Sequence, residues 1–238
     1  MEILLLFSVV AFLYASVGHG GASGYIALMA IFAFPQSEIK SNALFLNLFV
    51  SFISFTQFYK KEEFPFKLFF MLIVFSIPMA FLGRMWTLYN KCYKIILGLI
   101  FFIPTVKFLV FFPKMQFQVK QNLLLVIVLG LLIGLLSGLL GIGGGVILSP
   151  ILILLGWCTV KQTAAVSAIF IFVNSLAGLL GKSFATLQFS ENIVQILIFT
   201  LFGGILGGFF GANKFKILWI QYTLAFVLII ACFKLFTT

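Results

Sequence analysis

The sequence predicts an all-α integral membrane protein made of two inverted repeats, each with one broken, re-entrant helix pair and three transmembrane helices. Three observations lead to this prediction: a very apolar composition, a series of apolar stretches long enough to cross a bilayer, and a glycine motif that occurs twice. Of the 238 residues, 63% are apolar and 8% are charged. Because about a quarter of the residues of a soluble domain are charged, this chain has to fold in lipid.

The small number of ionisable residues excludes most kinds of catalysis. The chain has five acidic residues, none of them aspartate, and a single histidine. Paired-carboxylate chemistry and metal clusters need more such groups, so we expect no catalytic residues, no cofactor and no metal. The fifteen basic residues are scattered between apolar runs, which is typical of topology marking in a membrane protein and does not indicate a nucleic-acid partner.

Eight apolar stretches bounded by charged or turn residues follow one another along the chain: 3–34, 43–58, 66–82, 93–112, 123–155, 164–180, 193–210 and 217–233. Most are near the roughly 20 residues that a transmembrane helix needs. The first and the fifth are longer and contain glycines in the middle. As one helix the first would measure about 50 Å, against a hydrocarbon layer of roughly 30 Å, so each is expected to be two half-helices that dip into the membrane and return.

The two glycine motifs align at a constant offset of 123 positions, which indicates an internal duplication. Gly18, Gly20 and Gly21 correspond to Gly141, Gly143 and Gly144. We expect a first repeat over residues 1–113, a linker over 114–120 and a second repeat over 121–238, together forming one structural domain. A repeat with one dip and three crossings has an odd number of crossings, so the second repeat would be inverted relative to the first.

The glycine turns are the expected binding site for a small anion. The half-helices 25–34 and 146–155 begin directly after the glycines, and a helix N-terminus offers free N–H donors and a partial positive charge. In an inverted arrangement two such ends face each other near the midplane and can cradle one anion. Unwound backbone at this depth is tolerated only where it is buried in protein or lines a wet cavity.

Polar side chains near the turns extend this prediction. His19 lies inside the first turn, where it could donate to the anion or carry a proton with it, or could only cap the unwound backbone. Asn47, Ser51 and Ser54 share one helix face, as do Ser167 and Asn174; they could bond to a ligand or join neighbouring helices. The candidate substrate-binding residues are Gly18, His19, Gly20, Gly21, Ala22, Ser23, Asn47, Gly141, Ile142, Gly143, Gly144, Gly145, Ser167 and Asn174, with His19 also the proton-coupling candidate.

Two further glycine series have a different explanation. Gly130, Gly134 and Gly138 repeat every four residues, as do Gly203, Gly207 and Gly211. In lipid this spacing lets neighbouring helix backbones approach closely, so we expect both series to pack helices together.

With these motifs in view, the chain resembles the TauE/SafE family of sulfite and organosulfonate exporters. The segment SGLLGIGGGVILSPIL from Ser137 is similar to the signature of that family's second repeat, including Pro150 one turn into the half-helix, followed by Thr163, Ser167 and Asn174. The first repeat differs, because it has His19 and Ser23 where the family commonly has a glycine run followed by a proline. The resemblance implies a passive or proton-linked carrier of small sulfur oxyanions or of related carboxylates and sulfonates.

We therefore expect a secondary transporter in the cell inner membrane that exports a small anion such as sulfite or sulfoacetate by alternating access. An inside-negative potential of 100 mV favours efflux of a monovalent anion by about 2.3 kcal/mol, roughly fifty-fold in concentration, so export needs no coupling ion. An anion channel and a proton-coupled importer are the alternatives. The expected partners are the anionic substrate, the lipid bilayer and a second copy of the chain in a homodimer, with no nucleic acid.

Overall fold

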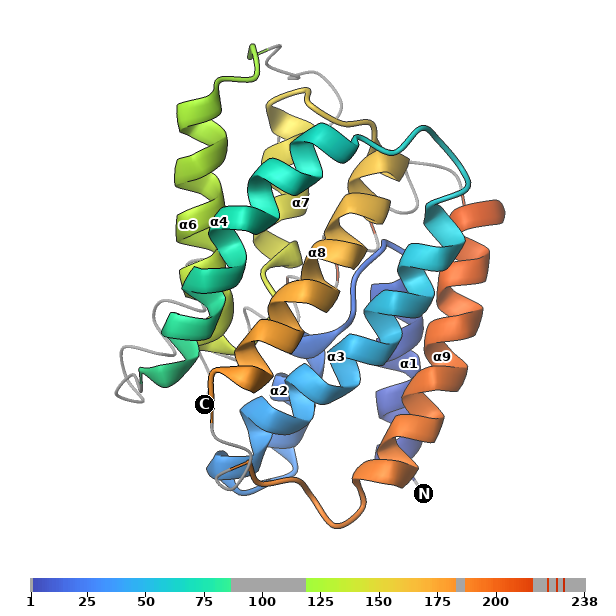
Figure 1. The fold of residues 1–238 in the computed structure, drawn as a ribbon. Helices are drawn as coiled ribbons and strands as arrows, with labels where there is room; N and C mark the ends of the chain where they lie inside the picture. Colours follow the sequence, from blue (N-terminus) through green and yellow to red (C-terminus); the bar gives the residue numbers. More distant parts are fainter. Residues whose placement is uncertain are drawn as a thin grey trace.

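The computed structural model describes residues 2–86, 119–182 and 187–215, together with the single positions 222, 226 and 229. The regular elements of these ranges are all α-helices (Figure 1). They are α1 (Glu2–Ala15), α2 (Ala22–Ile31), α3 (Gln36–Phe58), α4 (Phe66–Met85), α6 (Leu123–Leu140), α7 (Gly145–Leu154), α8 (Val160–Leu180) and α9 (Ile193–Asn213). By length and composition five of them, namely α3, α4, α6, α8 and α9, can cross a membrane.

The helices agree with six of the eight apolar stretches and correct some of their ends. Stretch 93–112 lies outside the described residues, as does stretch 217–233 apart from three single positions. The expected half-helix 25–34 was placed too late, because α2 already begins at Ala22, directly after Gly21. Helix α3 begins at Gln36, seven residues before stretch 43–58, because a polar first turn that follows Pro35 is helical too.

Both broken elements turn back to the end of the molecule where they started. The amide of Val119, before α6, donates to the carbonyl of Leu155 at the end of α7 at 3.2 Å. Trp157 Nε1 donates to the carbonyl of Val119 at 2.7 Å, in the same place. In Figure 1 the start of α1 and the end of α2 both lie at the opposite, lower end. Helices α2 and α7 therefore run in opposite directions, and each begins near the middle of the molecule.

The two glycine series pack helices backbone to backbone, as the sequence predicts. A Cβ on Gly130, Gly134 or Gly138 of α6 would meet the carbonyl of Leu72, Ser76 or Ala80 of α4 at 2.0–2.8 Å. A Cβ on Gly203, Gly207 or Gly211 of α9 would meet the carbonyl of Ser8, Phe12 or Ser16 at 2.0–2.1 Å. In each set the residue numbers of the glycines and of the carbonyls they meet increase in the same direction. Helix α4 therefore runs parallel to α6, and α1 runs parallel to α9. Each broken element is thus packed on a helix from the other half of the chain.

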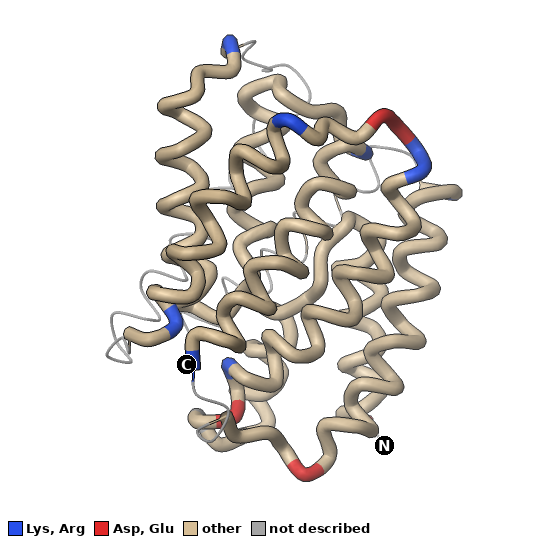
Figure 2. The backbone as a smooth tube through the Cα atoms, viewed as in Figure 1, with Lys and Arg blue, Asp and Glu red and all other residues tan. Residues whose placement is uncertain are grey.

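Helices α3 and α8 cross the centre of the bundle side by side and antiparallel (Figure 1). Their contacts run in opposite numerical order, with Gly178 close to Leu44 and the ring of Phe172 5.5 Å from that of Phe52. Figure 2 shows that the charged residues of the described chain lie at the two ends of the bundle and that its long middle is uncharged. This distribution is the one expected of a chain that spans a bilayer.

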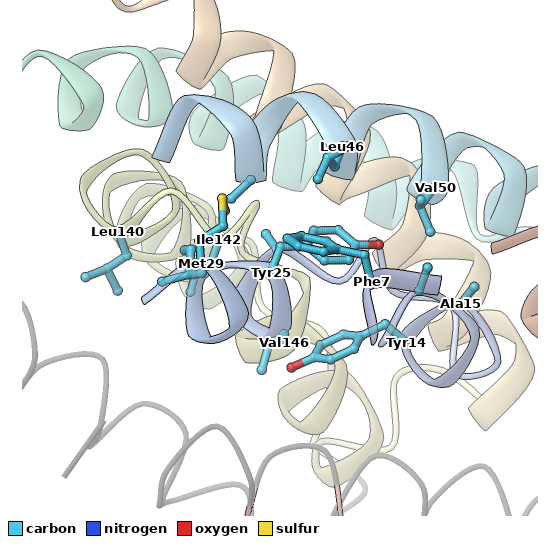
Figure 3. Close-up of a cluster of buried hydrophobic side chains, with 14 of the residues drawn as sticks. Phe7, Tyr14, Ala15, Tyr25, Met29, Leu46, Val50, Leu140, Ile142 and Val146 are labelled. Atoms are coloured by element: carbon cyan, nitrogen blue, oxygen red, sulfur yellow. The ribbon is translucent and has the colours of Figure 1, made fainter. Parts of the chain in front are cut away.

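Apolar packing holds the second glycine turn against the first half of the chain. Ile142 and Val146 belong to the same buried cluster as Phe7, Tyr25 and Met29 (Figure 3). The rings of Phe7 and Tyr25 stack with centroids 5.7 Å apart. The turns are therefore set in a close-packed apolar surrounding, where hydrogen bonds are stronger than they are in water.

Candidate functional site

The two glycine turns are buried in protein. Unwound backbone at this depth is tolerated either there or at the wall of a wet cavity. Residues 18–21 and 141–145 are all buried. Gly21 and Gly144, equivalent at the offset of 123, are the N-caps of α2 and α7 and have φ values of 97° and 78°. Only glycine adopts such left-handed conformations without strain, and this conformation lets the chain leave each turn directly into a new helix.

The side chain of Asn47, from the middle of α3, contacts both turns. Its Oδ1 accepts a hydrogen bond from the amide of Ala22, the first residue of α2, at 3.2 Å. A Cβ on Gly20 would lie 1.9 Å from this Oδ1, and a Cβ on Gly143 would lie 2.5 Å from Nδ2. The turns therefore abut opposite atoms of one carboxamide, and only glycine leaves room for it. Asn47 Nδ2 also donates to Ser175 Oγ of α8 at 3.0 Å, which links the two halves.

The His19 imidazole makes a second connection between the halves. It is 1% exposed, and its Nε2 lies 3.2 Å from the carbonyl oxygen of Gly145 and 2.8 Å from Ser149 Oγ, both on α7. Ser149 Oγ in turn lies 2.7 Å from Ser167 Oγ on α8. A carbonyl oxygen can only accept, so the contact with Gly145 requires the hydrogen on Nε2. In the neutral ring Nδ1 is then an acceptor.

Among the buried polar atoms that have no hydrogen-bond partner in the described part of the chain, four are of interest here: His19 Nδ1, Tyr25 Oη, Ser137 Oγ and Asn174 Oδ1. Tyr25 Oη would be 2.7 Å from a Cβ on Gly21, and Ser137 Cβ would be 3.3 Å from a Cβ on Gly144. Two of the four thus lie directly against the N-caps of α2 and α7. Buried polar groups are nearly always hydrogen-bonded, and those that are not require an explanation.

The other predicted polar residues form bonds with nearer partners. Ser23 Oγ lies 2.6 Å from the Tyr14 hydroxyl, and Asn174 Nδ2 donates to the carbonyl of Phe170 on its own helix at 2.9 Å. Ser51 and Ser54 donate to carbonyls of their own helix at 3.2 Å and 3.0 Å. Of the polar side chains singled out in the sequence, His19, Asn47 and Ser167 are those that the structure brings to the meeting point of the turns.

Three serines where the two turns meet were not among the site residues predicted from the sequence: Ser137, Ser149 and Ser175. Ser149 and Ser175 bond to residues 130 and 128 positions away. A local signal existed for two of them, because Ser137 and Ser149 lie one helical turn before and after the glycine turn at 141–144. Ile142, by contrast, is an apolar member of the core cluster, so only its backbone can serve a ligand.

The comparisons with known proteins extend over nearly the whole chain. The model of the family described as "Sulfite exporter TauE/SafE" matches residues 3–235. The chain is 32% identical to "Probable membrane transporter protein y4hK" of Sinorhizobium fredii (strain NBRC 101917 / NGR234), over 97% of this chain and 96% of that protein. No solved structure matches the chain.

Proposed function

The chain belongs to the TauE/SafE family and is a multi-pass membrane transporter, and we propose that it exports a small sulfur-containing or organic anion, such as sulfite or sulfoacetate, by alternating access. The observation that carries this proposal is the convergence of the two glycine turns on Asn47, with α2 and α7 leading away from it in opposite directions. Both helix N-termini, with their partial positive charge, are thereby brought to one buried place.

The proposed binding chemistry uses main-chain amides and no cationic side chain. Asn47 Oδ1 caps the amide of Ala22, so a neutral oxygen occupies the position at the α2 N-terminus that an anion's oxygen would take. Rotation of the carboxamide would release this amide to the substrate. The unpartnered hydroxyls of Tyr25 and Ser137 supply two further donors beside the turns.

His19 fits an anion that carries a proton. Because Nε2 is held by Gly145 and Ser149, the free Nδ1 accepts a hydrogen bond from an acidic O–H, such as that of bisulfite. A fully deprotonated oxygen would meet the Nδ1 lone pair, and binding it would require protonation of the ring. We propose that His19 selects the protonation form of the substrate.

We further propose that the two halves are inverted repeats and that alternating access exchanges their conformations. The offset of 123 that aligns the glycines also carries the bounds of α2, Ala22–Ile31, onto those of α7, Gly145–Leu154. The re-entrant elements enter from opposite ends of the bundle, and α3 and α8, which follow them, are antiparallel. Both facts support a symmetry axis in the membrane plane that passes near Asn47.

Export from the cell across its inner membrane agrees with the electrostatics of an uncoupled carrier. An inside-negative potential of 100 mV drives a monovalent anion outward by about 2.3 kcal/mol. The rival functions are an anion channel built from the same helix ends and an importer that takes up a proton with the anion, with His19 as the proton carrier.

Counterflow in proteoliposomes tests the proposal. Vesicles containing purified protein and unlabelled sulfite are diluted into a trace of labelled sulfite, with sulfoacetate and sulfate tested in parallel. A carrier accumulates label transiently above equilibrium. An imposed pH gradient should have little effect on uncoupled exchange of sulfoacetate, whose protonation does not change near neutral pH. Simple equilibration without an overshoot would indicate a channel, accumulation of sulfoacetate driven by an inward proton gradient would indicate an importer, and no flux of any tested anion would refute transport of this class.

A further inference from the structure

Three cationic side chains gather at the lower end of the bundle, away from the central site. Lys40 lies in the second turn of α3, Arg84 in the last turn of α4, and Lys182 just after the end of α8. Their sequence neighbours bring them together, because Arg84 bonds to Ser41, the residue after Lys40, and Gly181, the residue before Lys182, packs on Arg84. Arg84 is only 8% exposed, whereas Lys40 and Lys182 are half-buried and reach the surface.

Close packing of helix ends holds these side chains in place. Arg84 Nη2 donates to Ser41 Oγ at 3.2 Å, and Lys40 Nζ donates to the carbonyl of Leu139 in the last turn of α6 at 3.0 Å. A Cβ on Gly181 would lie 2.5 Å from the carbonyl of Phe81 and 3.0 Å from Arg84 Cβ. The glycine at position 181 therefore allows α8 to end against α4, and this contact brings Lys182 beside Arg84.

The cationic cluster is connected to the central site along two elements. Lys40 and Asn47 are seven residues, or two turns, apart on the same face of α3, a separation of about 10 Å. The Cβ and Cγ atoms of Lys40 would both be 3.4 Å from a Cβ on Gly141, the first glycine of the second turn. Glu38, an acidic residue in the first turn of α3, is two positions from Lys40 and so faces another side of the helix.

We propose that Lys40, Arg84 and Lys182 form a second anion site, at one mouth of the transport path, that collects the substrate and passes it to the glycine turns. The site takes a small oxyanion with at least two free oxygens, because the planar Arg84 guanidinium binds such groups through paired hydrogen bonds and the lysines add charge. Three cationic side chains at one end of the bundle raise the local concentration of small anions there. This inference rests on the proposed function of the central site.

Sulfite exchange by reconstituted variants, measured as KM and kcat at low and high salt, tests the inference. We expect Arg84→Gln and Lys182→Gln each to raise the KM at low salt by about fivefold with little change in kcat, because a steering charge affects capture of the anion and not its passage. The difference should become smaller in high salt, and more so for Lys182→Gln, because salt screens the half-buried Lys182 charge more than the buried Arg84 charge. Arg84→Lys keeps the charge but not the paired hydrogen bonds, so it should restore only part of the loss. Lys214→Gln, at the other end of the bundle, is the matched control.

Equilibrium binding of labelled sulfite to the purified protein separates this inference from the proposed function. We expect two sulfite sites per chain, of which Lys182→Gln removes one. Because Lys182 is half-buried at a helix end, this variant folds even if Arg84→Gln does not. An unchanged stoichiometry in Lys182→Gln, an unchanged KM, or an equal effect of Lys214→Gln overturns the second site. If the wild-type protein binds two sulfite ions but does not exchange sulfite, the proposed transport function is contradicted and the second binding site is not.

Discussion

At the scale of single residues, Asn47 is the residue on which the proposed anion site depends most, because its carboxamide lies at the N-terminus of α2 and against the second glycine turn. Asn47→Asp would place a permanent carboxylate where we expect the anion to bind. The helix dipole stabilises that charge, so the protein should remain folded. Repulsion between like charges should weaken sulfite binding by at least about tenfold.

The readouts for Asn47→Asp are labelled-sulfite binding and the unfolding temperature in detergent. Asn122→Asp is a matched control, because Asn122 caps α6 through the amide of Leu124, at 3.0 Å, on the exposed end of the bundle. An aspartate there caps equally well and adds the same charge far from the turns. Equal sulfite affinity in Asn47→Asp and Asn122→Asp would show that no anion binds at the α2 N-terminus.

His19 gives a prediction about pH. Glutamine in its place can still donate to the carbonyl of Gly145 but has no ring nitrogen that binds a proton, so His19→Gln should keep the fold and flatten the pH dependence of sulfite exchange. The measurement is the initial exchange rate at fixed total sulfite in wild type and variant. Superimposable pH profiles would reduce His19 to a structural link between the halves.

The central polar residues could be predicted from the sequence only in part. His19 is conspicuous as the single histidine within a glycine motif, and Asn47 and Ser167 follow from their spacing on a helix face. Ser175 could not be found in this way, because its bonding partner Asn47 is 128 residues away. Which side chains meet across two halves depends on how the halves pack, and a single sequence does not encode that in any local pattern.

At the scale of helices, the glycine series fix how closely each broken element packs on its neighbour. A Cβ on Gly134 would lie 2.3 Å from the Ser76 carbonyl, and one on Gly207 would lie 2.1 Å from the Phe12 carbonyl. Gly134→Ala and Gly207→Ala should therefore push α6 from α4 and α9 from α1, and each should lower stability by about 1–3 kcal/mol.

Thermal unfolding in detergent measures this effect, and Gly178→Ala is its control. A Cβ on Gly178 would be 3.3 Å from Cδ1 of Leu44, a flexible side chain that can move aside. Alanine also favours the helix by up to about 1 kcal/mol over glycine. We expect Gly178→Ala to unfold at or above the wild-type temperature, and both other variants below it. The reverse order would contradict backbone-to-backbone packing at the glycine series.

Helix positions were largely predictable, and helix starts were less so. The glycine motifs located both breaks, because several glycines together are too costly for a continuous helix. The start of α2 was missed by three residues because Ala22, Ser23 and Gly24 look like a continuation of the turn. What makes them helical is the left-handed Gly21 before them and the hydrogen bond from Ala22 to Asn47, a tertiary contact.

At the scale of the whole molecule, the re-entrant arrangement determines which loops face the same side of the membrane. Lys120 precedes α6 and Lys161 opens α8, and both lie at the end of the bundle where Leu155 meets Val119. Single cysteines at these two positions should react with a membrane-impermeant maleimide from the same side. A cysteine at Glu191, on the exposed loop before α9 at the opposite end, should react only from the other side.

The labelling is done in inside-out and right-side-out vesicles, after replacement of Cys92, Cys158 and Cys232 by alanine. If α6 and α7 together formed one crossing, Lys161→Cys would react from the side opposite to Lys120→Cys. That result would contradict the re-entrant arrangement and, with it, the meeting of two helix N-termini at the centre. Size-exclusion chromatography with light scattering on the same preparations tests the proposed homodimer, which a monomeric mass would refute.

The most direct measurement of the central claim is a crystal structure with selenite, an analogue of sulfite whose selenium scatters X-rays anomalously. We predict an anomalous peak between the turns at residues 20–22 and 143–145, within hydrogen-bonding reach of the amides that begin α2 and α7, and a rotated Asn47 side chain. A peak only at Lys40, Arg84 and Lys182, or no peak beside the two helix N-termini at saturating selenite, would contradict the claim.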